Sequence, residues 1–386
     1  MSFAVLARLV AHRSRQRSRI VLRLQQRTSS SAWDATSARK SGTYLDKASL
    51  TSPSKITRLL GKCRSHDEVI EIVNHAVASR LTDAVVVVSA LHRLAALEKG
   101  KASKSSKCSV QLRAEEQLID MLMKLMHKHI PEFGPREVAN ALWSFAVLRL
   151  SQPVLQDALA GRMCSYGSRA SLRHWANVVW SAATLRWDEA QLFDAARESI
   201  RVSGHSCNGR DLSQFMWAFA SGNRMGGCEI LEHISLSRGR RLGQLSCQDM
   251  ALIVWSSATL ACRSVAATEF LCEIAVLAHD RIQEINSQGT SMLLWGYVKL
   301  TSNAPEVLSL LRALQHGVLR KSSEFSTQGA ANVLWAFAAQ ACGPEDSHAS
   351  VEALTGAVLR RGQDLAHCNA QDVANILWSL ATLEHS

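Results

Sequence analysis

Proline, tyrosine and long apolar runs are scarce in this chain of 386 residues. It holds six prolines and three tyrosines. So few prolines favour long uninterrupted helices, and no apolar run reaches the roughly 18 residues that a membrane-spanning helix needs. The ten cysteines include no C-x-x-C pair, so neither a zinc site nor a disulfide framework is indicated. We interpret them as reduced, mostly buried thiols of an intracellular compartment.

Hydrophobic residues make up 47% of the chain and charged residues 20%. This balance is typical of a folded protein, and the length predicts several domains or a repeat array. No kinase signature, Walker A sequence or H-E-x-x-H motif is present. Histidines such as His92, His127 and His279 have no neighbours that predict acid–base or metal chemistry. We therefore expect no enzymatic activity, no metal and no cofactor.

The positive charge is concentrated at the N-terminus. The formal net charge is +11, yet residues 1–40 hold nine Arg or Lys side chains against one acid, Asp34, and the rest of the chain is only +3. Arginines alternate there with Leu, Val and Ile, and a Ser/Thr run follows. This composition is typical of an organellar transit peptide, with a disordered basic tail as the alternative. The bulk charge therefore indicates a leader and not a binding surface.

A tryptophan-centred segment recurs along most of the chain. Copies include EVANALWSFAVL at 137–148, HWANVVWSAATL at 174–185 and DVANILWSLATL at 372–383. Seven tryptophans mark the copies, at separations of 37, 37, 38, 40, 40 and 43 residues: Trp143, Trp180, Trp217, Trp255, Trp295, Trp335 and Trp378. A repeated period of this length predicts a stacked repeat architecture.

Each copy begins like an α-helix. The residue nine before the tryptophan is Gly in the first copy and Ser or Asn in the others: Gly134, Ser171, Asn208, Ser246, Asn286, Ser326 and Asn369. Acids follow three residues later in four copies, which is a helix N-cap pattern, so helix A of each repeat should start there. Small residues directly after the tryptophan let neighbouring helices approach closely. We interpret the tryptophan as core packing between repeats, with base stacking as the alternative.

Amphipathic segments at 188–202, 265–285 and 305–321 predict a second helix, helix B, in each repeat. Upstream, 83–97 fits the frame of helix A with Ser89 in the tryptophan column, after a helix at 65–79 and before a Lys/Ser-rich insert. We therefore predict an all-α, right-handed α-solenoid of tandem αα-hairpins. Its parts are a disordered leader at 1–40, N-terminal capping helices and insert at 41–110, and seven tryptophan-centred repeats at 111–386.

The segments DVANILWSLATL and EVANALWSFAVL, with SALHRL near residue 90, resemble the octotricopeptide or heptatricopeptide-type repeats of organellar RNA-binding proteins, over residues 55–386. The resemblance extends to the helical region of the FAST-kinase-like family and to the RNA-editing substrate-binding complex proteins. It implies a solenoid that binds single-stranded mRNA or rRNA and acts in transcript processing, stability, editing or ribosome assembly, beside other organellar RNA-processing proteins. With the leader, it implies a mitochondrial matrix protein, with the plastid as the alternative location.

Many proteins of that type end in a nuclease-like RAP domain, whereas this sequence ends after a helix A without its helix B. We therefore expect a C-terminally truncated chain, and an enzyme domain beyond residue 386 is one alternative. Another is a HEAT-like protein–protein scaffold within an organellar complex. A continuous positive stripe favours RNA, and a mixed or apolar groove favours protein.

Two alignment columns are candidate RNA contacts. A basic position near the end of helix B suits a phosphate backbone, although cations favour helix C-termini in general. This helix B basic column comprises Arg162, Arg201, Arg240, Arg241, Arg281, Arg320, Lys321, Arg360 and Arg361. The position seven before the tryptophan changes from Arg to Gln along the array, which makes it the better candidate for sequence specificity. The alternative is that these side chains are merely solvated in the first turn of the helix. It comprises Arg136, Arg173, Arg210, Gln248, Gln288, Gln328 and Gln371.

A third column, three before the tryptophan, is mostly amide. It comprises Asn140, Asn177, Gln214, Leu252, Met292, Asn332 and Asn375. Amides can read base edges, but four identical asparagines favour a structural role, such as a hydrogen bond to a neighbouring loop.

Overall fold

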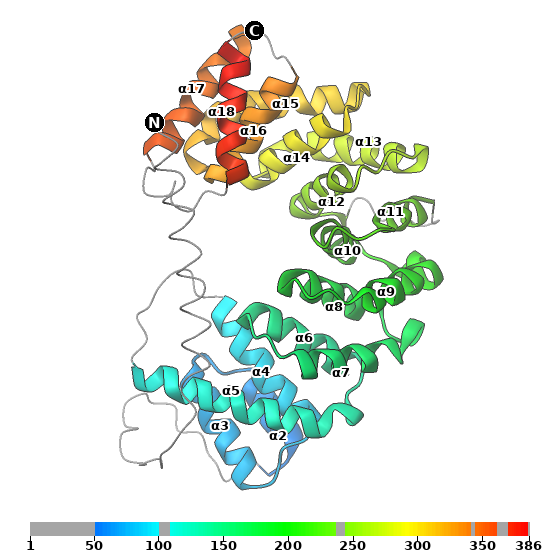
Figure 1. Cartoon of the computed structure of the whole chain (residues 1–386), viewed down its shortest axis with the longest axis vertical. Coiled ribbons are helices and arrows are strands. Elements are labelled where there is room, and N and C mark those ends of the chain that lie inside the picture. The colour runs from blue at the N-terminus through cyan, green and yellow to red at the C-terminus, as the bar shows by residue number, and fades with distance from the viewer. Residues whose placement is uncertain (1–50, 100–108, 237–243, 341–343, 361–369, 385–386) are drawn as a thin grey trace.

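The chain folds into a curved, two-layered array of α-helices (Figure 1). The structure, a computed structural model, describes residues 51–99, 109–236, 244–340, 344–360 and 370–384. These residues form 17 α-helices and short 3-10 turns, with no β-strand among them. The predicted leader at 1–40 lies outside the described residues.

Helix A of each repeat belongs to an even-numbered layer, which Figure 1 shows on the concave side of the curve. Its members contact one another in order from α4 to α18. They are α4 (Ala84–Lys99), α6 (Pro135–Leu148), α8 (Leu172–Leu185), α10 (Gly209–Ser221), α12 (Cys247–Leu260), α14 (Ser287–Leu300), α16 (Thr327–Ala339) and α18 (Ala370–Glu384). The segment predicted at 83–97 thus packs on α6 as the first helix A.

Helix B belongs to an odd-numbered outer layer, whose members contact in order from α7 to α17. The odd-numbered helices are α3 (His66–Ala78), α5 (Ser109–His129), α7 (Pro153–Cys164), α9 (Ala190–Ser203), α11 (Gly227–Leu236), α13 (Val265–Asp280), α15 (Pro305–Lys321) and α17 (Pro344–Arg360). A further helix, α2 (Pro53–Leu60), packs on α3 and α4. Contacts between successive helix pairs along both layers are those of an α-solenoid.

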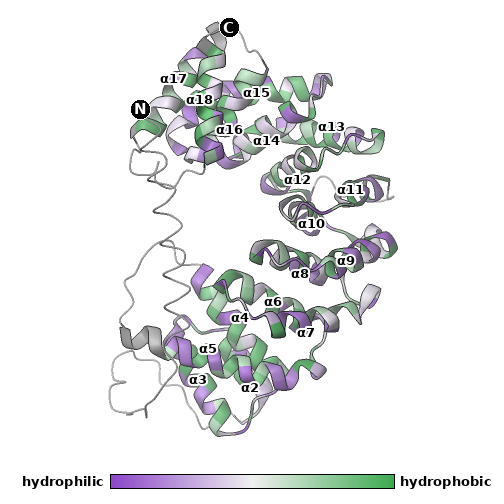
Figure 2. Ribbon diagram, viewed as in Figure 1, coloured by the Kyte–Doolittle hydropathy of each residue, from purple (hydrophilic) through white to green (hydrophobic). Residues whose placement is uncertain are grey.

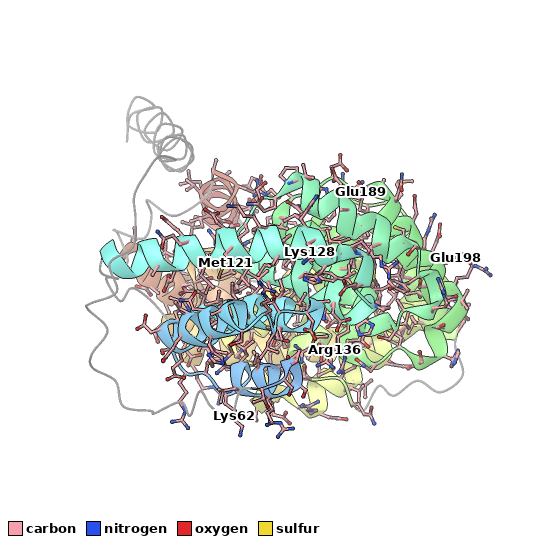
Figure 3. All side chains as sticks on the ribbon, turned by 90° about the horizontal axis from the view of Figure 1, so that it is seen from below. Lys62, Met121, Lys128, Arg136, Glu189 and Glu198 are labelled. Carbon is pink, nitrogen blue, oxygen red and sulfur yellow. A yellow bond between two sulfur atoms is a disulfide. The ribbon has the colours of Figure 1, made fainter. Side chains whose placement is uncertain are left out.

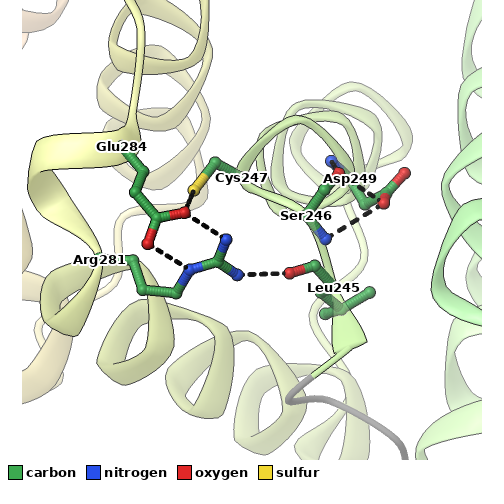
Figure 4. Close-up of polar contacts among 6 residues, drawn as sticks. All are labelled: Leu245, Ser246, Cys247, Asp249, Arg281 and Glu284. Carbon is green, nitrogen blue, oxygen red and sulfur yellow. Dashed lines mark hydrogen bonds and ion pairs between the residues drawn. The ribbon is translucent and has the colours of Figure 1, made fainter.

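Cap residues and prolines set the helix starts. Five predicted caps accept a hydrogen bond from the backbone N–H three residues later: Ser171, Asn208, Ser246, Asn286 and Ser326. At Ser246 the Asp249 carboxylate also accepts from the cap N–H, which completes a capping box (Figure 4). Five of the six prolines are first residues of helices: Pro53, Pro135, Pro153, Pro305 and Pro344. At that position the missing N–H forfeits no hydrogen bond.

The core lies between the two layers and between successive even-numbered helices. Val254, directly before Trp255, and Ser256, directly after it, are both fully buried. In α14 the small residue is Gly296, where a Cβ atom would stand 2.8 Å from Val254 Cγ1 and 3.2 Å from the Val254 carbonyl oxygen. The predicted close approach of helices at the small residues is thus confirmed.

The prediction that the repeat tryptophan is buried core is wrong in part. The tryptophans of the first six repeats are only half-buried, and Trp378 is 49% exposed. The fully buried aromatic side chains are others, such as Trp175, Phe215 and Phe337. Because helix A is covered by helix B and by its two neighbours, only its fourth side is open, and the tryptophan lies at that side.

The prediction of uniformly reduced thiols is also contradicted. Cys228 in α11 and Cys262, which follows α12, form a disulfide with their Cα atoms 5.2 Å apart. It joins helix B of one repeat to helix A of the next. Of the free cysteines that the structure describes, Cys63 is buried and the other four are half-buried. Burial raises the pKa of Cys63 to about 11 and that of Cys207 to about 12.

We expect the disulfide to contribute about 3 to 4 kcal/mol to the free energy of unfolding, because its cysteines are 34 residues apart. Cys228→Ser, Cys262→Ser and the double variant should therefore lose the same stability in urea denaturation. Cys164→Ser, at a half-buried free cysteine, is the control. Titration of all ten cysteines as free thiols in the unfolded, non-reduced protein would contradict the bridge.

Candidate nucleic-acid interface

The open side of the even-numbered helices forms a continuous surface, which we call the inner face. Its residues stand seven and three before the tryptophan, at the tryptophan, and four after it, so they share one line along each helix. In α8 this line is Arg173, Asn177, Trp180 and Thr184, each exposed or half-buried. Figure 2 shows hydrophilic and hydrophobic residues alternating along these helices. The hydrophobic residues mostly face neighbouring helices, so a ligand bound on the concave side would contact the residues of this line.

The tryptophan rings form a row along the inner face. The ring centroids of Trp180 and Trp217 are 6.2 Å apart, those of Trp255 and Trp295 6.3 Å, and those of Trp295 and Trp335 6.2 Å. Rings at such separations attract each other across the repeat boundary. Because they are only half-buried, they also present aromatic surface to a ligand.

Positive charge lies directly on this row. The Lys99 ammonium is 5.5 Å from the centroid of Trp143, and the Lys299 ammonium is 4.4 Å from that of Trp295. His92 of α4 continues the row, with its ring centroid 4.8 Å from Trp143. The ring contacts thus form three groups in one column, which are His92 with Trp143, Trp180 with Trp217, and Trp255 with Trp295 and Trp335.

Three arginines occupy the same place in successive helices. Arg136, Arg173 and Arg210 are the second residues of α6, α8 and α10, and all are exposed. A helix N-terminus carries partial positive charge, so an arginine there opposes the helix dipole. Its position therefore adds nothing to helix stability. Guanidinium groups and the N–H groups of a helix start both attract anions, so this column can contribute to an anion-binding surface.

Two histidines beside these arginines are affected by the same charges. Burial is the main cause that lowers the pKa of His92, and Arg136 adds to it. Burial also lowers the pKa of His174, partly offset by Glu137. Both imidazoles are therefore neutral at pH 7.

An acid beneath the arginines compensates them only in part. Asp211 is buried, with Oδ1 4.0 Å from Arg173 Nε and Oδ2 accepting a hydrogen bond from Asn208. Burial raises the pKa of this carboxyl, while the charges of Arg173 and Arg210 lower it. The inner face of α6, α8 and α10 is thus positive overall at this column.

From α12 onward, glutamine takes the place of arginine. Gln248, Gln288, Gln328 and Gln371 are all exposed. Gln371 donates a hydrogen bond to Asn375 Oδ1 at 2.8 Å, one turn along the same helix. The chemistry of the column therefore changes between α10 and α12, while its place on the helix stays the same.

The column three before the tryptophan makes amide contacts on the inner face. Gln214 donates to Asn177 Oδ1 at 3.4 Å, between α10 and α8. Gln214 thus joins one helix A to the next, and Asn375 accepts from Gln371 within α18, so neither contact goes to a loop as we expected. Leu252 and Met292 are its half-buried apolar members.

The helix B basic column has a role inside the protein. Arg162 Nε donates to the Phe133 carbonyl oxygen at 3.0 Å, and Arg281 Nη1 donates to that of Leu245 at 2.7 Å (Figure 4). Lys321 makes the same contact before α14. Each acceptor directly precedes the cap of helix A in the same repeat, so the cation fastens the end of helix B to the start of helix A.

Other members of that column form ion pairs on the outer layer. Arg201 lies 2.6 Å from Glu198, and Arg281 also lies 2.5 Å from Glu284. Figure 3, which views the array from below, shows Glu198 and Glu189 out at one side, away from Lys62 and Arg136. Arg320 is exposed, Arg360 ends α17, and Arg240, Arg241 and Arg361 lie outside the described residues. The described members of this column thus belong to the outer helices, and their predicted phosphate contacts stay a prediction.

We expect Arg162→Met to lower the free energy of unfolding by about 1 to 2 kcal/mol, because the Phe133 carbonyl loses a charged donor and keeps only the Tyr166 hydroxyl. Arg201→Met should leave the urea midpoint unchanged, since an exposed ion pair adds little. Equal losses of RNA affinity in both variants, without any change of midpoint, would restore the phosphate role of this column.

Among the described residues, no group of His, Cys, Asp and Glu side chains could hold a metal ion. No helix there is long and apolar enough to cross a membrane. His66 pairs with Glu115 at 2.5 Å and with Glu98 at 3.4 Å, which ties α3 to α5 and α4. These contacts serve packing of the N-terminal helices.

The inner face thus combines an arginine column in α6 to α10, a glutamine column in α12 to α18 and a row of tryptophans. Such a surface can attract anions and stack on flat rings. No protein-family model matches the chain, and no curated protein matches its sequence. The function is therefore inferred from this surface and from the sequence.

Proposed function

We propose that the protein is an organellar, non-enzymatic RNA-binding protein of the octotricopeptide type, with a right-handed solenoid that binds single-stranded RNA along its inner face. The observation that carries the proposal is the exposed column of Arg136, Arg173 and Arg210 beside half-exposed tryptophans. Cations bind phosphates, and aromatic rings stack on unpaired bases. A single strand offers phosphates to the arginines and unpaired bases to the tryptophans, whereas the base faces of a duplex are stacked inside it. Transcript processing, stability, editing or ribosome assembly is the proposed role.

The test is binding of the full chain to a labelled single-stranded RNA and to its duplex, measured by fluorescence anisotropy at several salt concentrations. We expect the single strand to bind more tightly, with an affinity that falls steeply with salt. Absence of binding to either RNA at low salt would contradict the proposal. Sequencing of transcripts crosslinked in cells would then identify the target.

A second candidate is a HEAT-like scaffold. It is favoured by Leu252 and Met292, which bring apolar side chains to the inner face in the helices of Trp255 and Trp295. An amphipathic partner helix binds such a surface through spaced apolar side chains. Leu252→Asp with Met292→Asp should abolish capture of a protein partner if the scaffold is the function, and leave RNA binding by the arginine column intact.

The proposed mitochondrial location rests on the leader. Residues 1–40 fused to a fluorescent reporter should direct it to mitochondria, because the segment is arginine-rich and poor in acids. The same fusion with its arginines changed to glutamine is the control and should stay in the cytosol. A cytosolic wild-type fusion would contradict the location, and a plastid signal would select the alternative.

A further inference from the structure

One position of helix A has two chemistries along the array. The second residue is arginine in α6, α8 and α10 and glutamine in α12, α14, α16 and α18, and all are exposed. Their place relative to the tryptophan is identical, so at this position the two halves of the inner face differ in the chemistry of the side chain. We call them the arginine half (α6 to α10) and the glutamine half (α12 to α18).

The arginine half suits the backbone of a nucleic acid. Guanidinium groups bind phosphate oxygens in a bidentate manner, and phosphate contacts carry no sequence information. The Lys99 ammonium over Trp143 adds a cation at the N-terminal end of this half. These residues therefore supply affinity, with little discrimination among bases.

The glutamine half suits bases. Its position in helix A carries no charge, while Trp255, Trp295 and Trp335 form a continuous run with centroids 6.2 to 6.3 Å apart. Stacking on aromatic rings is strong for every base, so the choice among bases comes from the amides. The cation of this half, Lys299, lies over Trp295 and can hold one phosphate near the row.

Amide chemistry narrows the choice of base. A carboxamide has one donor and one acceptor group, and this pair matches the N6 amino group and N7 of adenine. The corresponding edge of guanine presents two acceptors and is the partner of arginine or lysine. The Watson–Crick edge of each base also pairs one donor with one acceptor, so discrimination by an amide comes from the N6 and N7 edge. On that edge, exposed glutamines without arginine at the same position favour adenine over guanine.

We propose that bound RNA has its backbone held by the arginine half and its bases read by the glutamine half, with a preference for adenine. This inference rests on the proposed function, because it concerns the same inner face. Gln288 and Gln328, on neighbouring helices whose tryptophans contact each other, are the main specificity residues.

The test is binding of the full chain to labelled oligo(A), oligo(U), oligo(C) and oligo(A) with inosine at alternate positions, because inosine replaces the N6 amino group by an oxygen. Wild-type protein should prefer oligo(A) over each of the others. Gln288→Ala with Gln328→Ala should remove about tenfold of that preference per glutamine and leave the salt dependence unchanged. Gln191→Ala, on the outer helix α9, is the matched control and should change nothing.

The variant Arg136→Met with Arg173→Met provides the reciprocal result, because methionine removes the positive charge without placing a carboxamide at the position that reads bases. It should weaken all four oligonucleotides alike and keep the order of preference. Equal wild-type affinity for all four oligonucleotides would overturn the inference while the proposed function stands. An adenine preference that survives in the Gln288→Ala, Gln328→Ala variant would do the same. Absence of binding to any of them would instead overturn the proposed function itself. Unchanged thermal midpoints confirm that the variants are folded.

Discussion

Replacing Arg136, Arg173 and Arg210 together by glutamine should reduce the affinity for single-stranded RNA about 50-fold at 0.15 M salt. Each lost phosphate contact removes about 0.7 from the slope of log affinity against log salt, so three contacts remove about 2. Because this electrostatic contribution vanishes near 1 M salt, a slope change of about 2 corresponds to that loss of affinity at 0.15 M. The measurement is a set of binding isotherms between 0.05 and about 0.5 M salt.

The matched control removes the same charge from the outer layer. Arg201, Arg312 and Arg320 are exposed on α9 and α15, and their triple change to glutamine should alter the slope little. Equal losses in the two triple variants would show that net charge, and not the inner face, drives binding. An unchanged slope in the inner-face variant would favour the protein scaffold.

Trp175→Ala should have the largest effect on stability, a loss of about 3 to 5 kcal/mol in the free energy of unfolding. Trp175 is fully buried, and its Nε1 donates a hydrogen bond to the Gly167 carbonyl oxygen at 3.0 Å. Trp217→Ala should lose only about 1 to 2 kcal/mol, because that ring is half-buried against Trp180. Urea denaturation of both variants measures the difference.

RNA binding should respond in the opposite order. Trp217→Ala should weaken it, since the ring belongs to the inner face, whereas folded Trp175→Ala protein should bind normally. An equal loss of stability in the two variants, with RNA binding unchanged in both, would return the repeat tryptophan to a purely structural role.

The helix starts at the described Ser and Asn caps could be predicted from the sequence because each is set by local hydrogen bonds. Ser246 and Asp249 form the capping box that their spacing indicates. Ser171, Asn208, Asn286 and Ser326 each accept the backbone hydrogen bond of an N-cap. The place of the tryptophan could not be predicted in the same way. Helix A is covered on three sides, so apolar residues surround the tryptophan in sequence and hide its periodicity. The sequence signal for its place is the polar residues on the same line of the helix, such as Arg173 and Thr184 beside Trp180 in α8.

Contacts between residues of different helices could not be predicted from local sequence patterns. Cys228 and Cys262 meet only because stacking places the start of α11 beside the end of α12. Arg162, Arg281 and Lys321 of the helix B basic column each donate to a backbone carbonyl, a partner that leaves no mark in the sequence. Arg281 and Leu245 are 36 residues apart, and their distance depends on how helix B folds back on helix A.

Ultraviolet crosslinking of the full chain to single-stranded RNA, followed by mass spectrometry of the crosslinked peptides, tests the central claim most directly. Aromatic and cationic side chains of the inner face should carry the crosslinks, in peptides from α6 to α16 that contain the repeat tryptophans. Crosslinks confined to the odd-numbered outer helices, including peptides with Arg201 or Arg320, would contradict the claim that the inner face binds RNA.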